Sequence, residues 1–156
     1  MISTVNHVSF TVSNLEESIE FYKNVLGLEL ISLAERDEAF SAAVTGVPKA
    51  KMNIAYMKAA NCSIELIQYV QAGGERLDTH TNNIGSAHVC FNIRDYDEWM
   101  ERMKKNHVSF RGELCHAPAD QIREKEYAIA WIMMEIIWNS WRKYDRGLSS
   151  SHKIFF

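Results

Sequence analysis

The sequence predicts an α+β fold made of two related modules, of which the second is incomplete at its C-terminal end. The first observation is a repeat: residues 7–12, His-Val-Ser-Phe-Thr-Val, recur in similar form as residues 88–93, His-Val-Cys-Phe-Asn-Ile. Both copies alternate apolar and polar side chains, which is typical of a strand with one face in a core. The second observation is a helix signal that follows each copy at the same spacing. The third is that the pattern of the last strands is missing from the second module.

The first module, residues 1–71, opens with a strand at 3–12 and continues with a helix. Asn14 is a favourable N-cap and Glu17 follows it three residues later, as in a capping box. Gly27 can adopt the left-handed conformation that closes a helix. The apolar residues between these two signals recur at helical spacing: Leu15, Ile19, Tyr22, Val25 and Leu26.

Three further strands are predicted in the first module. A strand at 28–33 precedes a loop at 42–51, which contains glycine and proline. Residues 52–57 and 62–70 then form a pair of strands that turns at 59–61. The module therefore runs strand, helix, strand, strand, strand.

A linker and a partial copy of the first module follow. Residues 72–86 are polar and rich in glycine, which is typical of a linker. The second module, residues 87–121, repeats the opening with a strand at 87–93, a helix capped by Asp95 and a strand at 108–114.

Composition excludes several classes of function. The net charge of −3 gives no basic surface for nucleic acid. No segment reaches the roughly 20 apolar residues that span a bilayer, and the N-terminal residues do not resemble a secretion signal. The three cysteines lack CxxC spacing, which favours reduced thiols over a disulfide scaffold. We therefore expect a cytoplasmic protein that binds neither nucleic acid nor membrane.

Three side chains are candidates for a metal site. His7 and His88 each open a strand and fall on the face opposite its apolar residues, and Glu65 likewise lies opposite Ile64 and Leu66. A single histidine on a strand is more often a half-buried polar residue, and a single glutamate a solvated one, but the repeated context favours a shared role. Two imidazoles and a carboxylate suit Zn, Ni, Co, Fe or Mn, and the metal stays open. Affinity should fall as the histidines protonate.

Four stretches carry a resemblance to a known family. They are residues 7–12, residues 15–27 (Leu-Glu-Glu-Ser-Ile-Glu-Phe-Tyr-Lys-Asn-Val-Leu-Gly), residues 64–67 (Ile-Glu-Leu-Ile) and residues 85–91 (Gly-Ser-Ala-His-Val-Cys-Phe). With these stretches the chain resembles the vicinal oxygen chelate superfamily, which includes glyoxalases, bleomycin-resistance proteins and extradiol dioxygenases, over about residues 3–115.

The resemblance implies paired βαβββ modules that form a cupped mixed sheet around a divalent metal held by His7, Glu65 and His88. A ligand at Glu65 is typical of glyoxalase-type lyases and isomerases, which move a proton between adjacent carbons of a small substrate through a metal-bound enediolate. Many relatives complete the cup across a homodimer, so a homodimer is expected. The resemblance implies no organic cofactor and assigns no catalytic base here.

Two other functions stay open at this point. One is a non-enzymatic binding or resistance protein of the same fold that sequesters an aromatic or antibiotic ligand in the cup without a metal. The other is an Fe(II) extradiol dioxygenase, although those relatives use two histidines and a glutamate of the final strand. Metal content distinguishes the binding protein from the two metal-dependent enzymes, and oxygen consumption with catechols distinguishes the dioxygenase.

Residues 122–156 depart from the family's pattern. The last module of the family ends in Asp-Pro-Asp-Gly-Asn-x-(Leu/Ile)-Glu, whose glutamate is the remaining metal ligand, and this chain has no such stretch. We shift the reading frame of the segment from Trp131 to Trp141 so that each new codon starts at the third base of an old one. The shifted frame encodes Asp-x-Asp-Gly-x-x-x-Glu, because Trp and Met have single codons and these force the four named residues. We therefore interpret the segment as out of frame relative to its ancestor, with a divergent helix as the alternative. Without that glutamate, we expect weak or absent metal binding and little isomerase activity.

Overall fold

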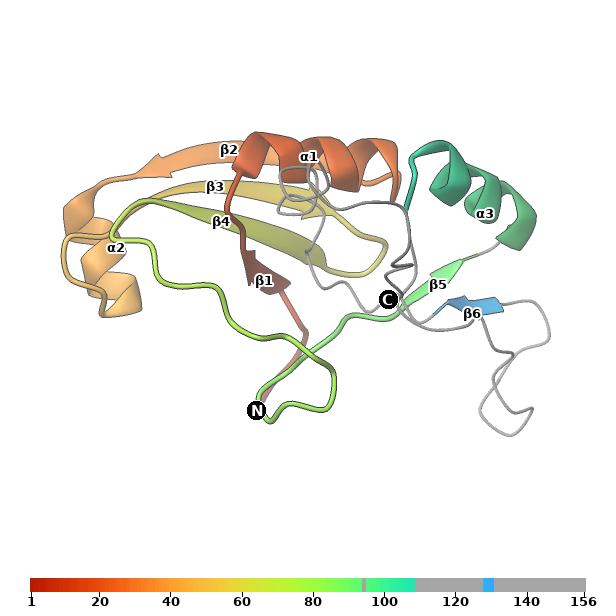
Figure 1. The fold of residues 1–156 in the computed structure, drawn as a ribbon. Helices are drawn as coiled ribbons and strands as arrows, with labels where there is room; N and C mark the ends of the chain where they lie inside the picture. The colour runs from red at the N-terminus through yellow and green to blue at the C-terminus, as the bar shows by residue number, and fades with distance from the viewer. Residues whose placement is uncertain (94, 109–127, 131–156) are drawn as a thin grey trace. The chain divides into compact units, whose positions relative to one another are not determined.

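The computed structural model describes residues 1–93, 95–108 and 128–130 (Figure 1). The chain divides into two compact units, the first spanning Met1–Leu77 and the second beginning at Asp78. Each unit has a sheet of its own.

The sheet of the first unit has four strands in the order β1-β4-β3-β2. β1 pairs with β4 in parallel, whereas β4, β3 and β2 are antiparallel neighbours. The strands are β1 (His7–Thr11), β2 (Glu29–Arg36), β3 (Lys51–Lys58) and β4 (Ser63–Gln71). This mixed sheet confirms the predicted α+β class, and the β3–β4 hairpin reproduces the predicted strand pair.

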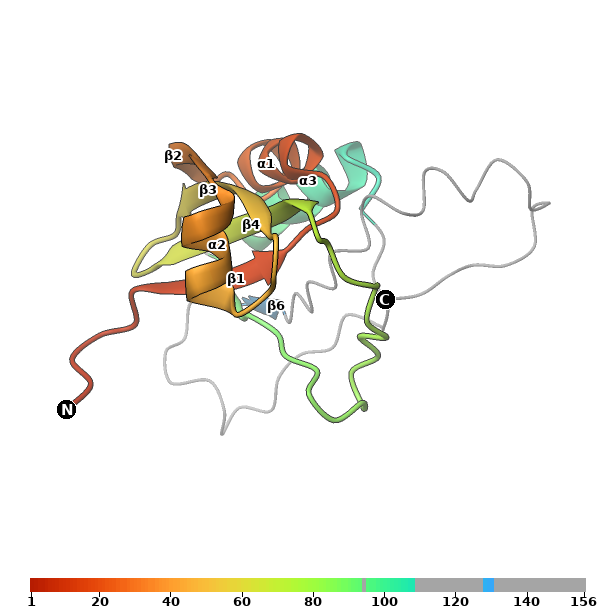
Figure 2. The same ribbon diagram turned by 90° about the vertical axis from the view of Figure 1, so that its left-hand side faces the viewer.

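Helix α1 (Leu15–Asn24) lies along one face of this sheet, as Figures 1 and 2 show. Asn14 caps it, because its side-chain oxygen accepts a hydrogen bond of 3.1 Å from the backbone N–H of Glu17. Gly27 follows the helix with a left-handed φ of 76°. The predicted helix signals are therefore confirmed at both ends.

A second helix, α2 (Glu38–Thr45), occupies part of the segment predicted as a loop at 42–51. That prediction is wrong for residues 42–45. Asp37 caps the helix by accepting a hydrogen bond of 2.9 Å from the backbone N–H of Phe40. Gly46, with a left-handed φ of 72°, ends it. Gly46 therefore ends a helix and is not part of a long loop.

Strand alternation gives the sheet of the first unit two different faces. Ile64 and Leu66 are fully buried on the face that carries α1. Gln68 shares their face, and its side-chain oxygen accepts a hydrogen bond of 3.0 Å from the backbone N–H of Leu15. Glu65 lies between them in sequence and therefore projects from the opposite face.

Tyr22 is fully buried in α1, and its hydroxyl has no hydrogen-bond partner among the described residues. Burial raises the pKa of this phenol above its usual range. We expect Tyr22→Phe to raise the free energy of unfolding by about 1 kcal/mol, because it removes a buried polar group that has no partner. Urea unfolding beside Tyr96→Phe, at a half-exposed tyrosine, checks this. A loss of stability would contradict it and would show that the Tyr22 hydroxyl is satisfied.

The second unit begins within the predicted linker and contains a short strand pair. β5 (Phe91–Ile93) pairs antiparallel with β6 (Ala128–Ala130). The strand predicted at 87–93 is therefore shorter than expected, because β6 supplies three residues for pairing. Residues 131–156 lie outside the described residues, as do all residues of the strand predicted at 108–114 except Val108.

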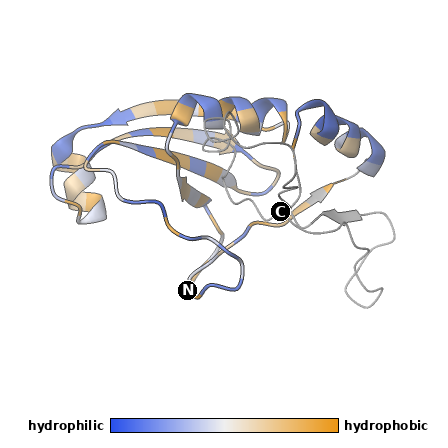
Figure 3. Ribbon diagram, viewed as in Figure 1, coloured by the Kyte–Doolittle hydropathy of each residue, from blue (hydrophilic) through white to orange (hydrophobic). Residues whose placement is uncertain are grey.

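Helix α3 (Tyr96–Lys105) follows β5 and confirms the second predicted helix. Asp95 caps it by accepting a hydrogen bond of 2.9 Å from the backbone N–H of Glu98. Trp99 and Met103 are buried, and Figure 3 shows hydrophilic residues along much of the rest of the helix. In the parts of the chain that the structure describes, no helix has the length and apolar character needed to cross a bilayer.

Candidate metal centre

His7 and Glu65 lie close together on the sheet face opposite α1. The parallel pairing of β1 with β4 sets Ser9 beside Glu65 and His7 beside Ser63. His7 Nε2 lies 3.4 Å from Glu65 Oε2, and the side chains of His7 and Glu65 are 37% and 9% exposed. The nearly buried carboxylate is therefore reached by one half-exposed imidazole.

The other nitrogen of His7 has a partner that favours one tautomer of the ring. Its Nδ1 lies 2.8 Å from Asn6 Oδ1, which is an acceptor, so this contact favours the tautomer with the proton on Nδ1. A neutral ring then presents the lone pair of Nε2 to the carboxylate of Glu65. Two electron-rich atoms at that separation repel each other unless a cation, either a proton or a metal ion, lies between them.

Tyr56 is a third side chain that contacts both His7 and Glu65. It is the direct antiparallel partner of Glu65 across β3 and β4, and its hydroxyl donates a hydrogen bond to Glu65 Oε1. Its ring also meets the ring of His7 edge-on, with the centroids 5.8 Å apart. The hydrogen bond to Glu65, followed by burial and by the charge of Glu65, raises the pKa of Tyr56, and Arg36 opposes this. The phenol therefore stays protonated and remains a donor at neutral pH.

The donor atoms of His7 and Glu65 fit a divalent metal. Two ligands that are each about 2.1 Å from one ion lie roughly 3.0–3.4 Å apart for angles between 90° and 109°. The observed 3.4 Å lies at the upper end of that range. One neutral nitrogen and one carboxylate oxygen are also the donor types that such ions take.

The third predicted ligand, His88, belongs to the second unit, where it is exposed and precedes β5. The structure thus brings together His7 and Glu65 within one unit. Within the described residues, no group of three His, Cys, Asp or Glu side chains is gathered closely enough to hold a metal ion. His7 and Glu65 are the part of the predicted set that the first unit assembles alone.

Sequence reasoning did not find Tyr56. Its position opposite Glu65 depends on the register of the hairpin: Lys58 pairs with Ser63, which sets residue 56 opposite residue 65, whereas a turn centred on residue 60 would set it opposite residue 64. Alternation then puts both side chains on one face of the sheet.

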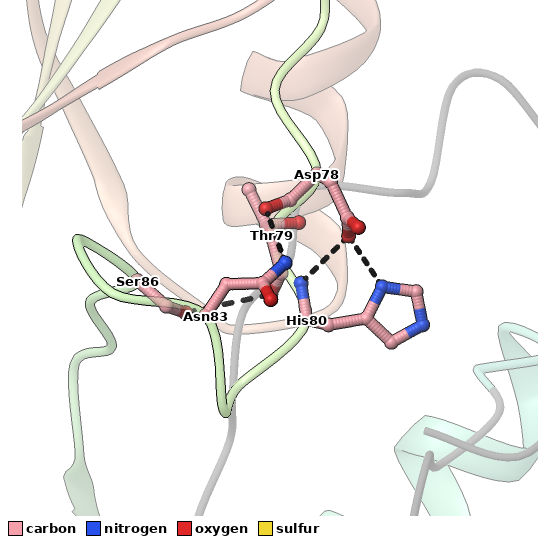
Figure 4. Close-up of polar contacts among 5 residues, drawn as sticks. All are labelled: Asp78, Thr79, His80, Asn83 and Ser86. Atoms are coloured by element: carbon pink, nitrogen blue, oxygen red, sulfur yellow. Dashed lines mark hydrogen bonds and ion pairs between the residues drawn. The ribbon is translucent and has the colours of Figure 1, made fainter.

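A second histidine–carboxylate pair lies in the segment between the two sheets (Figure 4). Asp78 accepts hydrogen bonds from the ring Nδ1 and the backbone N–H of His80. These bonds lower the pKa of Asp78 to about 2. Asn83 donates to the backbone carbonyl of Asp78 at 3.2 Å, and Ser86 donates to that of Thr79 at 3.4 Å. Both members of the pair are about two-thirds exposed, so the group is a turn that fixes the backbone of this segment.

Comparison with known proteins agrees with this architecture. Residues 4–126 match the family model described as the glyoxalase/bleomycin resistance protein/dioxygenase superfamily. The metallothiol transferase FosB of Staphylococcus haemolyticus is 26% identical over 111 residues, which are 70% of this chain and 64% of that protein. FosB of Staphylococcus epidermidis is 26% identical over the same shares of the two chains. The match thus spans less than two thirds of the length of these relatives.

Solved structures show the same fold. A glyoxalase family protein from Bacillus cereus superposes with a TM-score of 0.68 at 24% identity, covering 76% of this chain and 81% of that one. A mutant of the fosfomycin resistance protein FosX from Listeria monocytogenes, with Mn(II) and 1S,2S-dihydroxypropylphosphonic acid bound, superposes with a TM-score of 0.50 at 25% identity. That match covers 72% of this chain and 78% of FosX. With its family-model match over most of its length, the chain belongs to the glyoxalase/bleomycin resistance protein/dioxygenase superfamily.

Proposed function

We propose that this chain is a metal-dependent enzyme of the superfamily in which His7, Glu65 and His88 hold a divalent cation beside a small oxygen-chelating substrate. The observation that carries the proposal is the approach of His7 Nε2 to Glu65 Oε2, 3.4 Å apart on one face of the sheet. When a neutral imidazole carries its proton on Nδ1, the tautomer that Asn6 Oδ1 favours, a cation between Nε2 and Oε2 relieves the repulsion between these two atoms. Glu65 is nearly buried, so an unpaired charge there would be costly.

A bound divalent cation would polarise an oxygen of the substrate and favour loss of a proton from the neighbouring carbon. The residues of the chain itself have distinct tasks. His7 supplies its Nε2, and the contact of Nδ1 with Asn6 Oδ1 favours the tautomer that leaves the lone pair of Nε2 free. Glu65 supplies negative charge, and Tyr56 donates to its second oxygen. The reaction proposed first is the proton transfer of a glyoxalase-type lyase or isomerase, weakened by the missing last ligand.

A second candidate reaction is the modification of fosfomycin, and the comparisons favour it. The relatives include a metallothiol transferase, FosB, and a fosfomycin resistance protein with Mn(II) and a phosphonic acid bound, FosX. A phosphonate substrate needs a cationic partner. Arg36 lies on β2 and its charge acts on Tyr56, while its guanidinium lies 5.3 Å from the centroid of the Phe40 ring. The ion pairs found among the described residues leave Arg36 without a carboxylate partner.

Metal titration followed by three substrate assays tests these proposals. We expect Mn(II) to bind weakly, with one ion per chain, when followed by electron paramagnetic resonance of the free ion. The loaded chain is then given a 2-oxoaldehyde hemithioacetal, fosfomycin with a thiol, or a catechol with oxygen. Slow turnover of the first supports the isomerase, and turnover of the second supports the resistance enzyme.

Two results would contradict the proposal. Absence of Mn(II) binding at millimolar concentration would favour a ligand-binding protein that works without metal. Oxygen consumption with the catechol would favour a dioxygenase. Full metal occupancy together with rapid turnover would instead overturn the expectation that this chain is impaired.

A further inference from the structure

We propose that Tyr56 is a positioning residue that holds Glu65 by one oxygen, so that Glu65 offers only Oε2 to the metal. This inference rests on the proposed function and adds to it a residue and a mode of coordination. It follows from three contacts made within the first unit.

The first contact is the hydrogen bond between the two side chains. Tyr56 and Glu65 are direct partners in the antiparallel pairing of β3 with β4, so both side chains leave the sheet on the same face. The hydroxyl of Tyr56 donates to Oε1 of Glu65. Glu65 Oε2 is the oxygen that lies 3.4 Å from His7 Nε2. The two oxygens of one carboxylate are thus divided between a tyrosine and a histidine.

The second contact is between Tyr56 and His7. The two rings meet at 81° with their centroids 5.8 Å apart, which is an edge-to-face arrangement. One side chain therefore touches both proposed ligands of the first unit. Because Tyr56 stands on a strand with neighbours on both sides, its backbone position is well fixed.

The third contact is between His7 and Asn6. Asn6 holds the nitrogen of His7 that faces away from Glu65, at 2.8 Å. Tyr56 holds the oxygen of Glu65 that faces away from His7. Each ligand thus has one atom fixed by a neighbour and one atom left for the metal, which is how outer partners orient the ligands of metal sites.

The hydrogen bond from Tyr56 limits how Glu65 can coordinate a metal. A carboxylate with both oxygens free can bind a metal through two oxygens and occupy two positions. With Oε1 held by Tyr56, Glu65 occupies one position and leaves another for an oxygen of the substrate. Tyr56 acts through Glu65 and need not touch the substrate.

The test is Tyr56→Phe, which keeps the ring against His7 and removes only the hydroxyl. We expect the Kd for Mn(II) to rise by about 10- to 100-fold, the usual cost of losing an outer partner of a ligand. The matched control is Tyr69→Phe. Tyr69 lies on the same strand and the same face as Glu65, opposite Met52, and its Kd should stay at the wild-type value.

A double-mutant cycle on the metal-free protein tests the contact between Tyr56 and Glu65 independently of metal binding. The unfolding free energies of Tyr56→Phe, Glu65→Leu and the double variant are compared with that of the wild-type chain, because leucine has no oxygen that can accept from Tyr56. Non-additive effects are expected if the hydroxyl acts through the carboxylate. Additive effects would overturn the proposed contact, whatever the metal does.

The remaining outcomes are also decisive. If the wild-type chain binds Mn(II) and Tyr56→Phe binds it equally well, the positioning role is wrong and the proposed function survives. If the wild-type chain binds no Mn(II) while the cycle shows coupling, the contact is real, and both the metal-dependent function and the metal-positioning role fall.

Discussion

Glu65→Gln is expected to weaken Mn(II) binding by more than about 100-fold, beyond the 10- to 100-fold usual for losing an outer partner, because it removes a ligand itself. The substitution keeps the shape of the side chain and an oxygen that can accept from Tyr56. It removes the negative charge, and a neutral amide is a far weaker partner for a divalent cation. Because the Glu65 side chain is only 9% exposed, water has little access to replace the lost carboxylate as a ligand.

The measurement is an Mn(II) titration by electron paramagnetic resonance, with circular dichroism to show that the variant is folded. Glu29→Gln is the matched control, since Glu29 is an exposed carboxylate on β2 whose partner is Lys58 at 3.7 Å. It should leave the affinity at the wild-type value. Equal affinities for Glu65→Gln and the wild-type chain would place the metal elsewhere and remove the basis of the proposed function.

The placement of Glu65 could be predicted from the sequence because strand alternation is a local property. Ile64 and Leu66 need the core, so the residue between them must leave the sheet on the other side. The same reasoning placed His7 opposite Val8 and Phe10, and β1 shows that alternation in its exposure. Period-two patterns of this kind depend on the residue's own neighbours alone.

The sequence pattern predicts neither the role of Tyr56 nor helix α2, for two different reasons. The role of Tyr56 depends on the register between two strands, which a single strand's pattern does not contain. Helix α2 is only eight residues long, and its limits are marked only by its two caps, Asp37 and Gly46. Short helices give weak periodicity, so their caps are the better signal.

His88 marks the limit of local reasoning for the site. The repeat identifies His88 as the counterpart of His7, because each histidine opens the strand that precedes its module's helix. Its strand, however, begins at Phe91 rather than at residue 87, because pairing partners decide where a strand starts. The distance from His88 to Glu65 depends on how two modules pack, and no sequence pattern within either module carries that information.

The shifted reading of residues 131–141 implies that a frameshift in the gene gave rise to the C-terminal segment. The family-model match ends at residue 126, shortly after the point where the sequence pattern changes. Four residues of Asp-x-Asp-Gly-x-x-x-Glu are forced by the codons of Trp131, Met133, Met134 and Trp138 with their neighbours. Sequencing the gene checks the remaining positions, since codons that exclude the family's residues there would contradict a frameshift.

A chain carrying the shifted reading from Trp131 onward is expected to bind Mn(II) at least about 100-fold more tightly than the present chain. The reason is that the junction of Trp138 with Asn139 then encodes the glutamate that completes the family's ligand set. A gained carboxylate ligand should have an effect as large as the one lost in Glu65→Gln. Turnover of the hemithioacetal should rise with the affinity.

The control is the same restored chain with that new glutamate replaced by glutamine. It separates the gain of a ligand from the gain of a correctly folded C-terminal strand, because only the ligand depends on the carboxylate. A restored chain that binds no more tightly than its glutamine control would show that the last ligand is not what this chain lacks. Any binding that remains would then be assigned to the three proposed ligands, His7, Glu65 and His88.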